Sequence, residues 1–448
     1  MQHTENRPDT LCGMSYRFAT LGCTHAGYSA RGMRMHRPTG WNVRVVDGQI
    51  AYHQAITQII ATDSRGVWHG GDVTHWSRPL PRDVESVQRL DDLLHDAGLW
   101  NGKNSGNHCA GSGADLSAVS VFDRPAMNAF TVYPDRRRSA EDSVGPHPGL
   151  YEIHQPDPDQ QIYLHVISHY GLDPSLRDQG IDIDPHPLDH GVNILCSHGI
   201  FVGDERLYKA AERHGADRLI PTDWVTRGFD LTLLSDYHTP GRIEGFGAPD
   251  GFGQVWYTGS TVRRGFSDDE TARGWLQVDI PDHGAPQVSL REIWQRPQLD
   301  FDPIDATGMT VTAINDLVRD RLASQSWTDP TSADLTGDGG WILRQRIVGA
   351  SPQQRQGIYE LTGDWANAAS DAAYWSLAFE NPLGVVSLAQ PTHLQASITE
   401  RVSDFQAALD DRADRGNVGK VLRDAPEELR ERALERARSV LGAPRADS

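Results

Sequence analysis

The stretch GVWHGGD, residues 66–72, is typical of a short buried strand that stops at a glycine pair followed by a carboxylate. Before it, SYRFATLG (15–22) also predicts a strand, and GQIAYHQAITQIIATD (48–63) places apolar residues at helical spacing. After it, a second helical face runs from Val84 to Ala97. The order strand, helix, strand, helix is typical of an α/β core, which we therefore predict for this part of the chain.

Further strand-like segments follow, and their density predicts a second sheet that packs on the first. They are IYLHVI (162–167), NILCSHG (193–199), DLTLLSDYH (230–238), QVWYTGS (254–260), GWLQVDI (274–280) and PQVSLREIW (286–294). Residues 134–160 are rich in proline, aspartate and arginine, and we expect most of them to form a loop or a hairpin.

The chain changes character near residues 296–308. A helix predicted at 313–324 and the segment GGWILRQRIVGA (339–350) indicate a small separate α+β unit, and two amphipathic helices follow it. We therefore divide the chain into a disordered extension (1–14), a core domain (15–295), a small α+β domain (296–390) and a helical tail (391–448).

Composition narrows the function classes. The 448 residues carry 42 basic and 61 acidic side chains, a net charge of −19, which disfavours a protein that wraps DNA by its own charge. The polar N-terminus does not resemble a signal peptide, and no apolar run reaches the roughly 18 residues that a membrane span needs. Four scattered cysteines do not predict a disulfide scaffold, so we expect a cytoplasmic protein.

Side chains that could bind metal ions follow the predicted strands, where open α/β sheets place their ligand sites. They are His25, Asp72, Asn107, His108, His198, Asp236 and His238. Imidazole, carboxylate and amide groups together suit divalent metals of borderline hardness. A pair of such ions is an economical device for hydrolysing a phosphodiester, so the pattern indicates a two-metal hydrolase.

Several motifs resemble, in order and approximate spacing, those of the calcineurin-like metallophosphoesterases. They are TLGCTHAGY, WHGGDVTHWSRP, SGNHCAG, ILCSHG, LLSDYHTP and VWYTGSTVRRGF. More narrowly, they resemble the SbcD branch, the nuclease subunits of bacterial SbcC–SbcD complexes that process DNA breaks. The resemblance covers about residues 15–300. It implies a four-layer α/β sandwich of two packed sheets flanked by helices, with a capping domain at 296–390 and a C-terminal helix-loop-helix.

The resemblance also implies roles for the candidate residues. His25 and His238 would bind one metal ion, His198 and Asn107 the other, and Asp72 would bridge the two. His108 would protonate the leaving oxygen as general acid. Two divalent ions are expected, with manganese as the expected metal.

Two positions depart from the family pattern. Cys23 stands where the family has the aspartate of its first metal-binding turn, and Asp236 stands in place of a histidine. Asp236 preserves a ligand, or it is a hydrogen-bonding neighbour of the site. Cys23 is either a ligand, whose soft thiolate favours zinc or iron, or a small buried residue without a metal role.

Other residues near these motifs have a structural and a functional interpretation. We interpret His69 and His75, on either side of Asp72, as supporting or structural residues. Cys109 replaces the aspartate that usually follows Gly-Asn-His, and we expect it to shape the loop. Arg263 and Arg264, like the run Arg136 to Arg138, could contact DNA phosphates or form a solvated face.

The resemblance predicts a manganese-dependent DNA exo- and endonuclease that acts with an SbcC-like ATPase. The helical tail would dock on that ATPase, and a homodimer is expected from the resemblance alone. An acidic nuclease subunit would then rely on its partner to grip DNA. Two alternatives remain, a phosphodiesterase for a small substrate and a scaffold subunit whose activity is weakened by Cys23.

Overall fold

The computed structural model describes residues 14–30, 33–110, 117–134, 145–204, 218–266, 268 and 270–380. The predicted N-terminal extension, the run Arg136 to Arg138 and the predicted helical tail (391–448) lie outside these described residues. The described residues belong to one compact unit that ends at Glu380. Among its helices, none is both long enough and apolar enough to cross a membrane.

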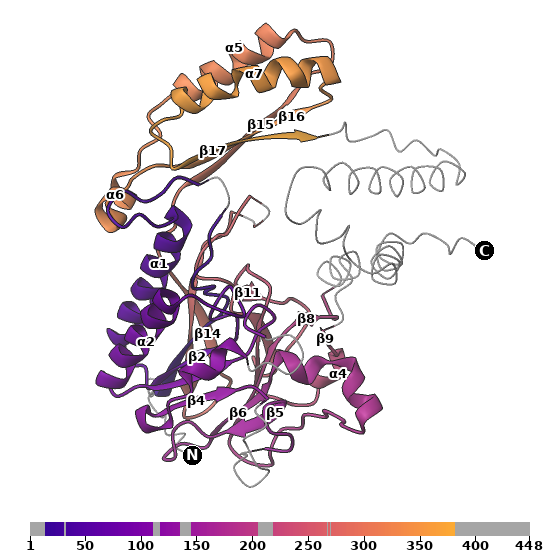
Figure 1. Ribbon diagram of the computed structural model, residues 1–448. Helices are drawn as coiled ribbons and strands as arrows, with labels where there is room; N and C mark the ends of the chain where they lie inside the picture. The colour runs from indigo at the N-terminus through magenta and orange to yellow at the C-terminus, as the bar shows by residue number, and fades with distance from the viewer. Residues whose placement is uncertain are drawn as a thin grey trace, which may run out of the picture. The chain divides into compact units, whose positions relative to one another are not determined.

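The first sheet has the strand order β14-β13-β1-β2-β3-β4, and its centre is built from parallel strands near the start of the chain (Figure 1). Its strands are β1 Met14–Leu21, β2 Gly66–His69, β3 Trp100–Asn104, β4 Ala129–Val132, β13 Gly274–Pro281 and β14 Gln287–Glu292. Strands β1 to β4 run parallel, whereas β13 pairs antiparallel with β1 and with β14. The strands predicted at 15–22 and 66–72 are confirmed.

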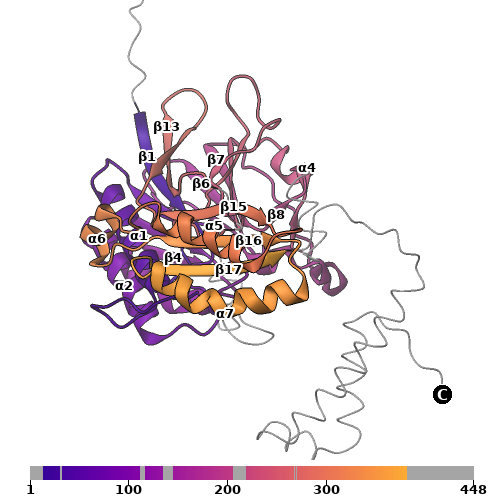
Figure 2. The ribbon, with the colours of Figure 1, turned by 90° about the horizontal axis from the view of Figure 1, so that it is seen from above.

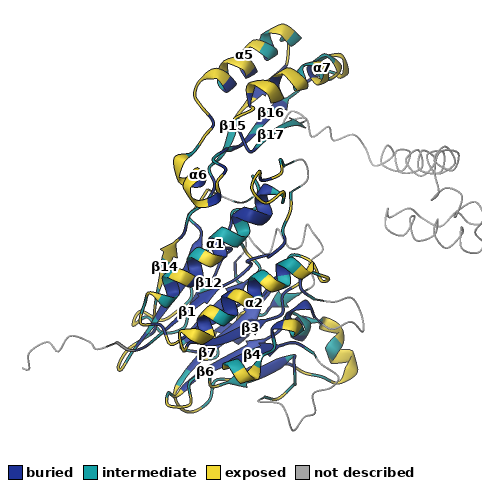
Figure 3. Ribbon diagram, turned by 60° about the vertical axis from the view of Figure 1, so that its left-hand side comes forward, coloured by how far each residue is buried: buried dark blue, intermediate teal, exposed yellow. Residues whose placement is uncertain are grey.

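Two helices, α1 (Val43–Ile60) and α2 (Pro81–Asp96), cover one face of this sheet with their buried sides (Figure 3). The predicted helical spacing places Ala55 and Ile59 of α1 in the same core as Val87 and Leu94 of α2. Helix α1 begins earlier than predicted because the side chain of Asn42 accepts a hydrogen bond from the backbone N–H of Arg44.

The second sheet has the order β11-β12-β10-β7-β6-β5. Its strands are β5 Tyr151–His154, β6 Ile162–Ile167, β7 Val192–His198, β10 Leu231–Ser235, β11 Gly241–Arg242 and β12 Gln254–Tyr257. Phe18 and Trp68 of the first sheet share a buried core with Leu164, Ile194 and Leu233 of the second, so the sheets pack face to face. The other face of the second sheet is covered by α4 (Thr222–Val225), short 3₁₀ turns and the two-stranded ribbon β8 (Ile200–Phe201) with β9 (Leu219–Ile220). The predicted class, two packed sheets with helices outside, is confirmed.

One local expectation was wrong. The strands predicted at 274–280 and 286–294 join the first sheet instead of the second. Strand β13 pairs antiparallel with β1, with Pro281 opposite Met14 and Leu276 opposite Thr20, and β14 pairs with β13. Alternation of side chains identifies a strand but not its partner, which depends on contacts between distant segments. Within residues 134–160, which were predicted to form mostly a loop or a hairpin, Tyr151–His154 forms the edge strand β5, and this strand pairs antiparallel with β6.

Residues 298–380 form a smaller α+β arrangement with a core of its own (Figures 1 and 2). Three parallel strands, β15 (Gln298–Asp305), β16 (Ile342–Val348) and β17 (Tyr374–Glu380), make its sheet. The helices are α5 (Val311–Ala323), α6 (Pro330–Thr336) and α7 (Pro352–Ala368). The helix predicted at 313–324 is confirmed, and β16 lies within 339–350. The domain boundary at 295/296 stays a prediction.

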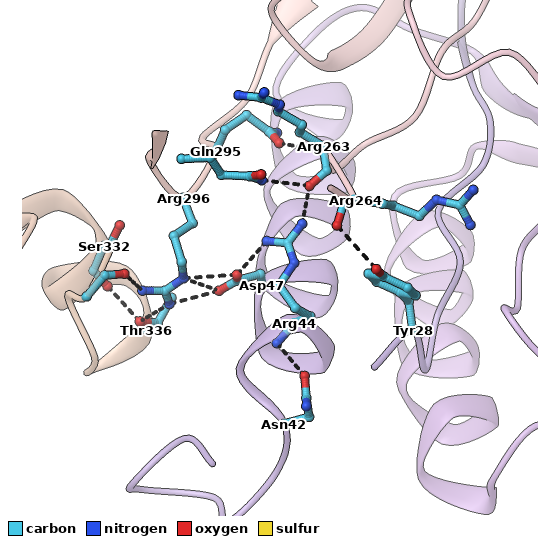
Figure 4. Close-up of polar contacts among 12 residues, drawn as sticks. Tyr28, Asn42, Arg44, Asp47, Arg263, Arg264, Gln295, Arg296, Ser332 and Thr336 are labelled. Carbon is cyan, nitrogen blue, oxygen red and sulfur yellow. Dashed lines mark hydrogen bonds and ion pairs between the residues drawn. The ribbon is translucent and has the colours of Figure 1, made fainter. Parts of the chain in front are cut away.

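A buried ionic network joins this smaller arrangement to α1 (Figure 4). Both oxygens of Asp47 accept hydrogen bonds from the Arg296 guanidinium at 2.8–3.0 Å, and one accepts another from Arg44 at 2.8 Å. Arg296 also donates to the carbonyl oxygens of Asp338 and Gly340 at 2.8 and 2.7 Å. The three charged side chains are 0–1% exposed, so each charge depends on the others.

We predict that Asp47→Ala lowers the free energy of unfolding by about 3–5 kcal/mol, because it leaves two buried guanidinium groups without their carboxylate. Urea denaturation followed by tryptophan fluorescence measures this loss. Asp63→Ala, which removes an exposed carboxylate at the end of α1, is the control. A loss no larger than that of the control would contradict the ionic role of Asp47.

Candidate metal centre

The candidate residues lie at the ends of strands or on the turns that follow them, and backbone hydrogen bonds hold the first two of these turns together. Past the ends of β1 and β2, the N–H of Cys23 donates to the backbone carbonyl of Gly71 at 2.9 Å, and the N–H of His25 donates to the backbone carbonyl of Asp72 at 2.8 Å. The pairing of the two strands therefore continues into their turns. It places the side chains of the first turn beside that of Asp72.

The backbone at these positions is strained. Of the described non-glycine residues, five have a positive φ, and four of them belong to the candidate site: Cys23 (47°), His25 (47°), Asp72 (53°) and Asp236 (104°). Each such conformation costs on the order of 1–3 kcal/mol and persists only where the surroundings enforce it. Strain concentrated on these residues indicates that their side-chain directions are functionally constrained.

Glycines allow the two sheets to meet at this point. A Cβ on Gly70 would overlap the Ser235 hydroxyl, one on Gly71 would overlap the His198 ring, and one on Gly106 would overlap the Asp72 carboxylate. Ser235 and His198 come from the second sheet, whereas the glycines come from the first. The GGD and SGNH motifs therefore supply the close approach that brings ligand atoms of both sheets together.

The carboxylate of Asp72 lies at the middle of the cluster. Its Oδ2 is 3.5 Å from His25 Nε2 and 3.6 Å from His198 Nε2, while its Oδ1 accepts a hydrogen bond from the His108 N–H at 2.8 Å. Asn107 Oδ1 lies 3.4 Å from His198 Nε2, and Asp236 Oδ1 lies 3.8 Å from it. Asp72 thus faces one histidine from each sheet.

Two groups of ligand atoms, each within 4.8 Å of one another, could hold a cation. One group is Cys23, His25 and His238, and the other is Cys23, Asp72 and His198. These two groups contain five of the seven predicted ligands, and Cys23 belongs to both. The other two, Asn107 and Asp236, lie beside His198 at the distances given above.

The donor atoms of these side chains fit divalent cations. His198 Nδ1 donates to the Gly70 carbonyl at 3.0 Å, which turns Nε2 toward the oxygens of Asp72, Asn107 and Asp236. His25 Nε2 is buried without a hydrogen-bond partner. A buried polar nitrogen without a hydrogen bond is unfavourable, and a cation bound there would satisfy it.

Burial sets the protonation of this cluster. It holds the pKa of His25 well below its usual value, with Arg264 and the neighbouring histidines adding to the effect, so the ring is neutral. Burial also raises the pKa of the Cys23 thiol well above its usual value, and the carboxylates of Asp72 and Asp236 raise it further. Without a cation the sulfur is therefore a neutral thiol. A bound ion would favour the thiolate, the form that binds metal.

His108 lies beside the cluster, with its ring 4.7 Å from that of His25. Its Nδ1 donates to the His75 carbonyl at 3.0 Å, which leaves Nε2 available to a substrate. His75, interpreted from sequence as supporting or structural, forms a third group of potential ligand atoms with His25 and His108. His69 supports the turn: Gly71 N–H donates to its Nδ1 at 3.2 Å, and its Nε2 donates to Thr24 at 2.9 Å.

The remaining predicted residues lie around the cluster. Cys109 is buried and free, and its sulfur accepts a hydrogen bond from the Gly106 N–H at 3.0 Å, so it shapes the SGNH turn. The guanidinium of Arg264 lies over the Tyr28 ring at 5.7 Å, whereas Arg263 donates to the Asp268 carbonyl of its own loop at 3.3 Å.

Sequence reasoning missed Asp268. Its carboxylate lies 3.4 Å from His238 Nδ1 and accepts a hydrogen bond from the Arg264 N–H at 2.9 Å. Burial alone would raise the pKa of Asp268, but the bonds with His238 and Arg264 bring it down to about 2. This aspartate lies in a loop without periodicity, and only its distance of four residues from Arg264 in the VRRGF motif could have drawn attention to it.

Comparisons with known proteins identify no family. No protein-family model matches the sequence, and no curated protein does. Among solved structures the chain is similar to a dimetal phosphatase from Danio rerio, with 11% sequence identity and a TM-score of 0.32, over 62% of this chain and 99% of that one. A likeness at this level identifies neither a substrate nor a site, so the assignment of the centre depends on its own geometry.

We predict that Gly106→Ala abolishes metal binding at the Asp72 group, because the added Cβ would displace the Asp72 carboxylate and the His198 ring. Isothermal titration with Mn²⁺ and Zn²⁺ measures the loss. Gly363→Ala in α7, where a Cβ meets nothing within 4 Å, is the matched control. Wild-type affinity in Gly106→Ala would show that close packing at this glycine does not maintain the centre.

Proposed function

We propose that the protein is a metal-dependent phosphodiesterase whose centre is the Cys23, His25, Asp72, Asn107, His198, Asp236 and His238 cluster. The observation that carries this proposal is the Asp72 carboxylate facing imidazole nitrogens from both sheets, on a backbone strained at four of the cluster positions. Cys23, His25 and His238 would hold one ion. Asp72, His198, Asn107 and Asp236 would hold the second.

Each part of the centre has a distinct task in such a reaction. Bound cations would supply Lewis-acid activation of water and neutralise charge on the phosphodiester. Asp72, with one oxygen facing both His25 and His198, would keep the ligands of the two ions at a fixed distance from each other. His108 would donate a proton from Nε2 to the leaving oxygen, since the His75 carbonyl holds its Nδ1 and so fixes the direction of the ring.

We further propose DNA as the substrate, with the protein acting in the cytoplasm as the nuclease subunit of an SbcC–SbcD-like complex. An aromatic surface beside the centre supports a nucleic-acid substrate. Trp76 is 50% exposed and contacts the His75 ring edge-on at 4.6 Å. The Tyr28 ring, which the Arg264 guanidinium covers, also contacts the His75 ring edge-on, at 5.0 Å. Exposed aromatic rings stack on unpaired bases, with about 1–3 kcal/mol per base.

The acidic net charge of −19 supports a division of labour in which a partner supplies most of the grip on DNA. We propose an SbcC-like ATPase as that partner, bound through the helical tail, and a homodimeric subunit. Both proposals come from the sequence resemblance. The tail lies outside the described residues.

The metal content tests the centre itself. We expect two ions per chain by mass spectrometry after dialysis against trace manganese, iron and zinc. Cys23→Ala should lose at least one ion, because the sulfur is one of the three proposed ligands of the first ion and its atom also lies within 4.8 Å of those of Asp72 and His198. Cys23→Asp should retain two and increase the share of manganese, because a carboxylate is a harder ligand than a thiolate. Fewer than two ions in the wild type would contradict a two-metal centre.

Hydrolysis assays test the reaction and its substrate. We expect the wild type to cleave DNA, and we expect His108→Gln to lower kcat about 10²–10⁴-fold with unchanged metal content, because only proton donation is lost. His95→Gln, at an exposed position on α2, is the control. Turnover of bis-p-nitrophenyl phosphate without DNA cleavage would instead identify a small-substrate phosphodiesterase. Inactivity toward both, restored by Cys23→Asp, would identify a scaffold subunit.

A further inference from the structure

The loop segment from Arg263 to Asp268 lies between β12 and β13 and brings a largely buried carboxylate to His238 of the candidate centre. The side chain of Asp268 is 13% exposed. Its Oδ1 lies 3.4 Å from His238 Nδ1, and its Oδ2 accepts a hydrogen bond from the Arg264 N–H at 2.9 Å. The carboxylate is therefore held by its own loop while it faces a histidine from another.

We propose that Asp268 is a positioning residue for His238, an inference that rests on the proposed metal centre. By accepting the Nδ1 proton of His238, Asp268 selects the tautomer in which Nε2 carries the lone pair. That nitrogen is then the one free to bind a cation with Cys23 and His25. A carboxylate behind a ligating histidine fixes the direction of the ring and raises its basicity.

A positioning residue must itself be fixed, and this loop is held from several sides. The hydroxyl of Tyr28 donates to the Arg264 carbonyl at 3.2 Å, and Gln298 donates to the Arg263 carbonyl at 3.0 Å. The Arg344 guanidinium of β16 lies 4.4 Å from the centre of the Phe266 ring. The residues that hold the loop thus come from the segment that follows β1 and from strands β15 and β16 of the 298–380 arrangement.

The carboxylate has a property that the isosteric amide lacks. Asp268 uses one oxygen for the His238 proton and the other for the Arg264 N–H. An asparagine has only one oxygen, so it must either lose the bond that orients it or turn its NH₂ group toward His238. In the second case the ring would accept at Nδ1 and carry its proton on Nε2, where it could no longer bind metal.

The test is metal affinity of the full chain, measured by titration with Mn²⁺ and with Co²⁺, whose visible absorption reports ligation at a site that contains Cys23. We expect Asp268→Asn to bind one ion about 10–100-fold more weakly and the other ion as the wild type does. Asp282→Asn, at an exposed turn position with the same change in charge, should bind both ions normally. Equal affinity in Asp268→Asn and the wild type would overturn the proposal.

His238→Ala separates this proposal from the one on which it rests. If His238→Ala loses an ion and Asp268→Asn does not, the metal centre stands and the role of Asp268 is wrong. If His238→Ala binds both ions like the wild type, His238 is no ligand and the proposed centre fails with it.

Nitrogen-15 NMR of the metal-free wild type provides a measurement that needs no variant. We expect His238 to carry its proton on Nδ1, and a proton on Nε2 would overturn the proposal.

Discussion

The carboxylate of Asp72 is the contact on which the arrangement of the centre depends. One oxygen is held by the backbone N–H of His108, which ties the turn after β3 to the turn after β2. The other faces His25 from the first sheet and His198 from the second. A single side chain thus meets residues from two other turns and from the end of β7. This contact explains why the backbone of Asp72 is held in the left-handed region and why glycines surround it.

The donor atoms of the candidate centre are both hard and soft. Asp236 and Asn107 place oxygen atoms beside His198, whereas Cys23 places a sulfur atom beside His25. Oxygen ligands suit manganese, and a thiolate suits zinc or iron. In the absence of a cation, burial and two carboxylates disfavour the thiolate of Cys23, so as a proposed ligand it would need the charge of a bound ion to stabilise its thiolate form.

The 298–380 arrangement contacts the rest of the protein through the buried Asp47 network and through the loop that leads to Asp268. Arg296 joins it to α1, while Gln298 and Arg344 hold the loop that leads to Asp268. Arg44, which shares the Asp47 carboxylate, also donates to the carbonyl of Arg263 in that loop. One continuous set of polar contacts therefore runs from the smaller sheet to the neighbour of His238. If the smaller sheet moved, either these contacts would break or the loop that carries Asp268 would move with the sheet.

Local sequence determined the strands and helices of the core, because side-chain periodicity is a property of short segments. It also identified the residues at the strand ends, since the chain leaves each parallel strand at the same edge of a sheet. Only the tertiary structure decided that β13 joins β1, that His75 lies among the candidate ligands and that Asp268 meets His238. These contacts join segments far apart in the chain, and they follow from how whole sheet faces pack rather than from any local pattern.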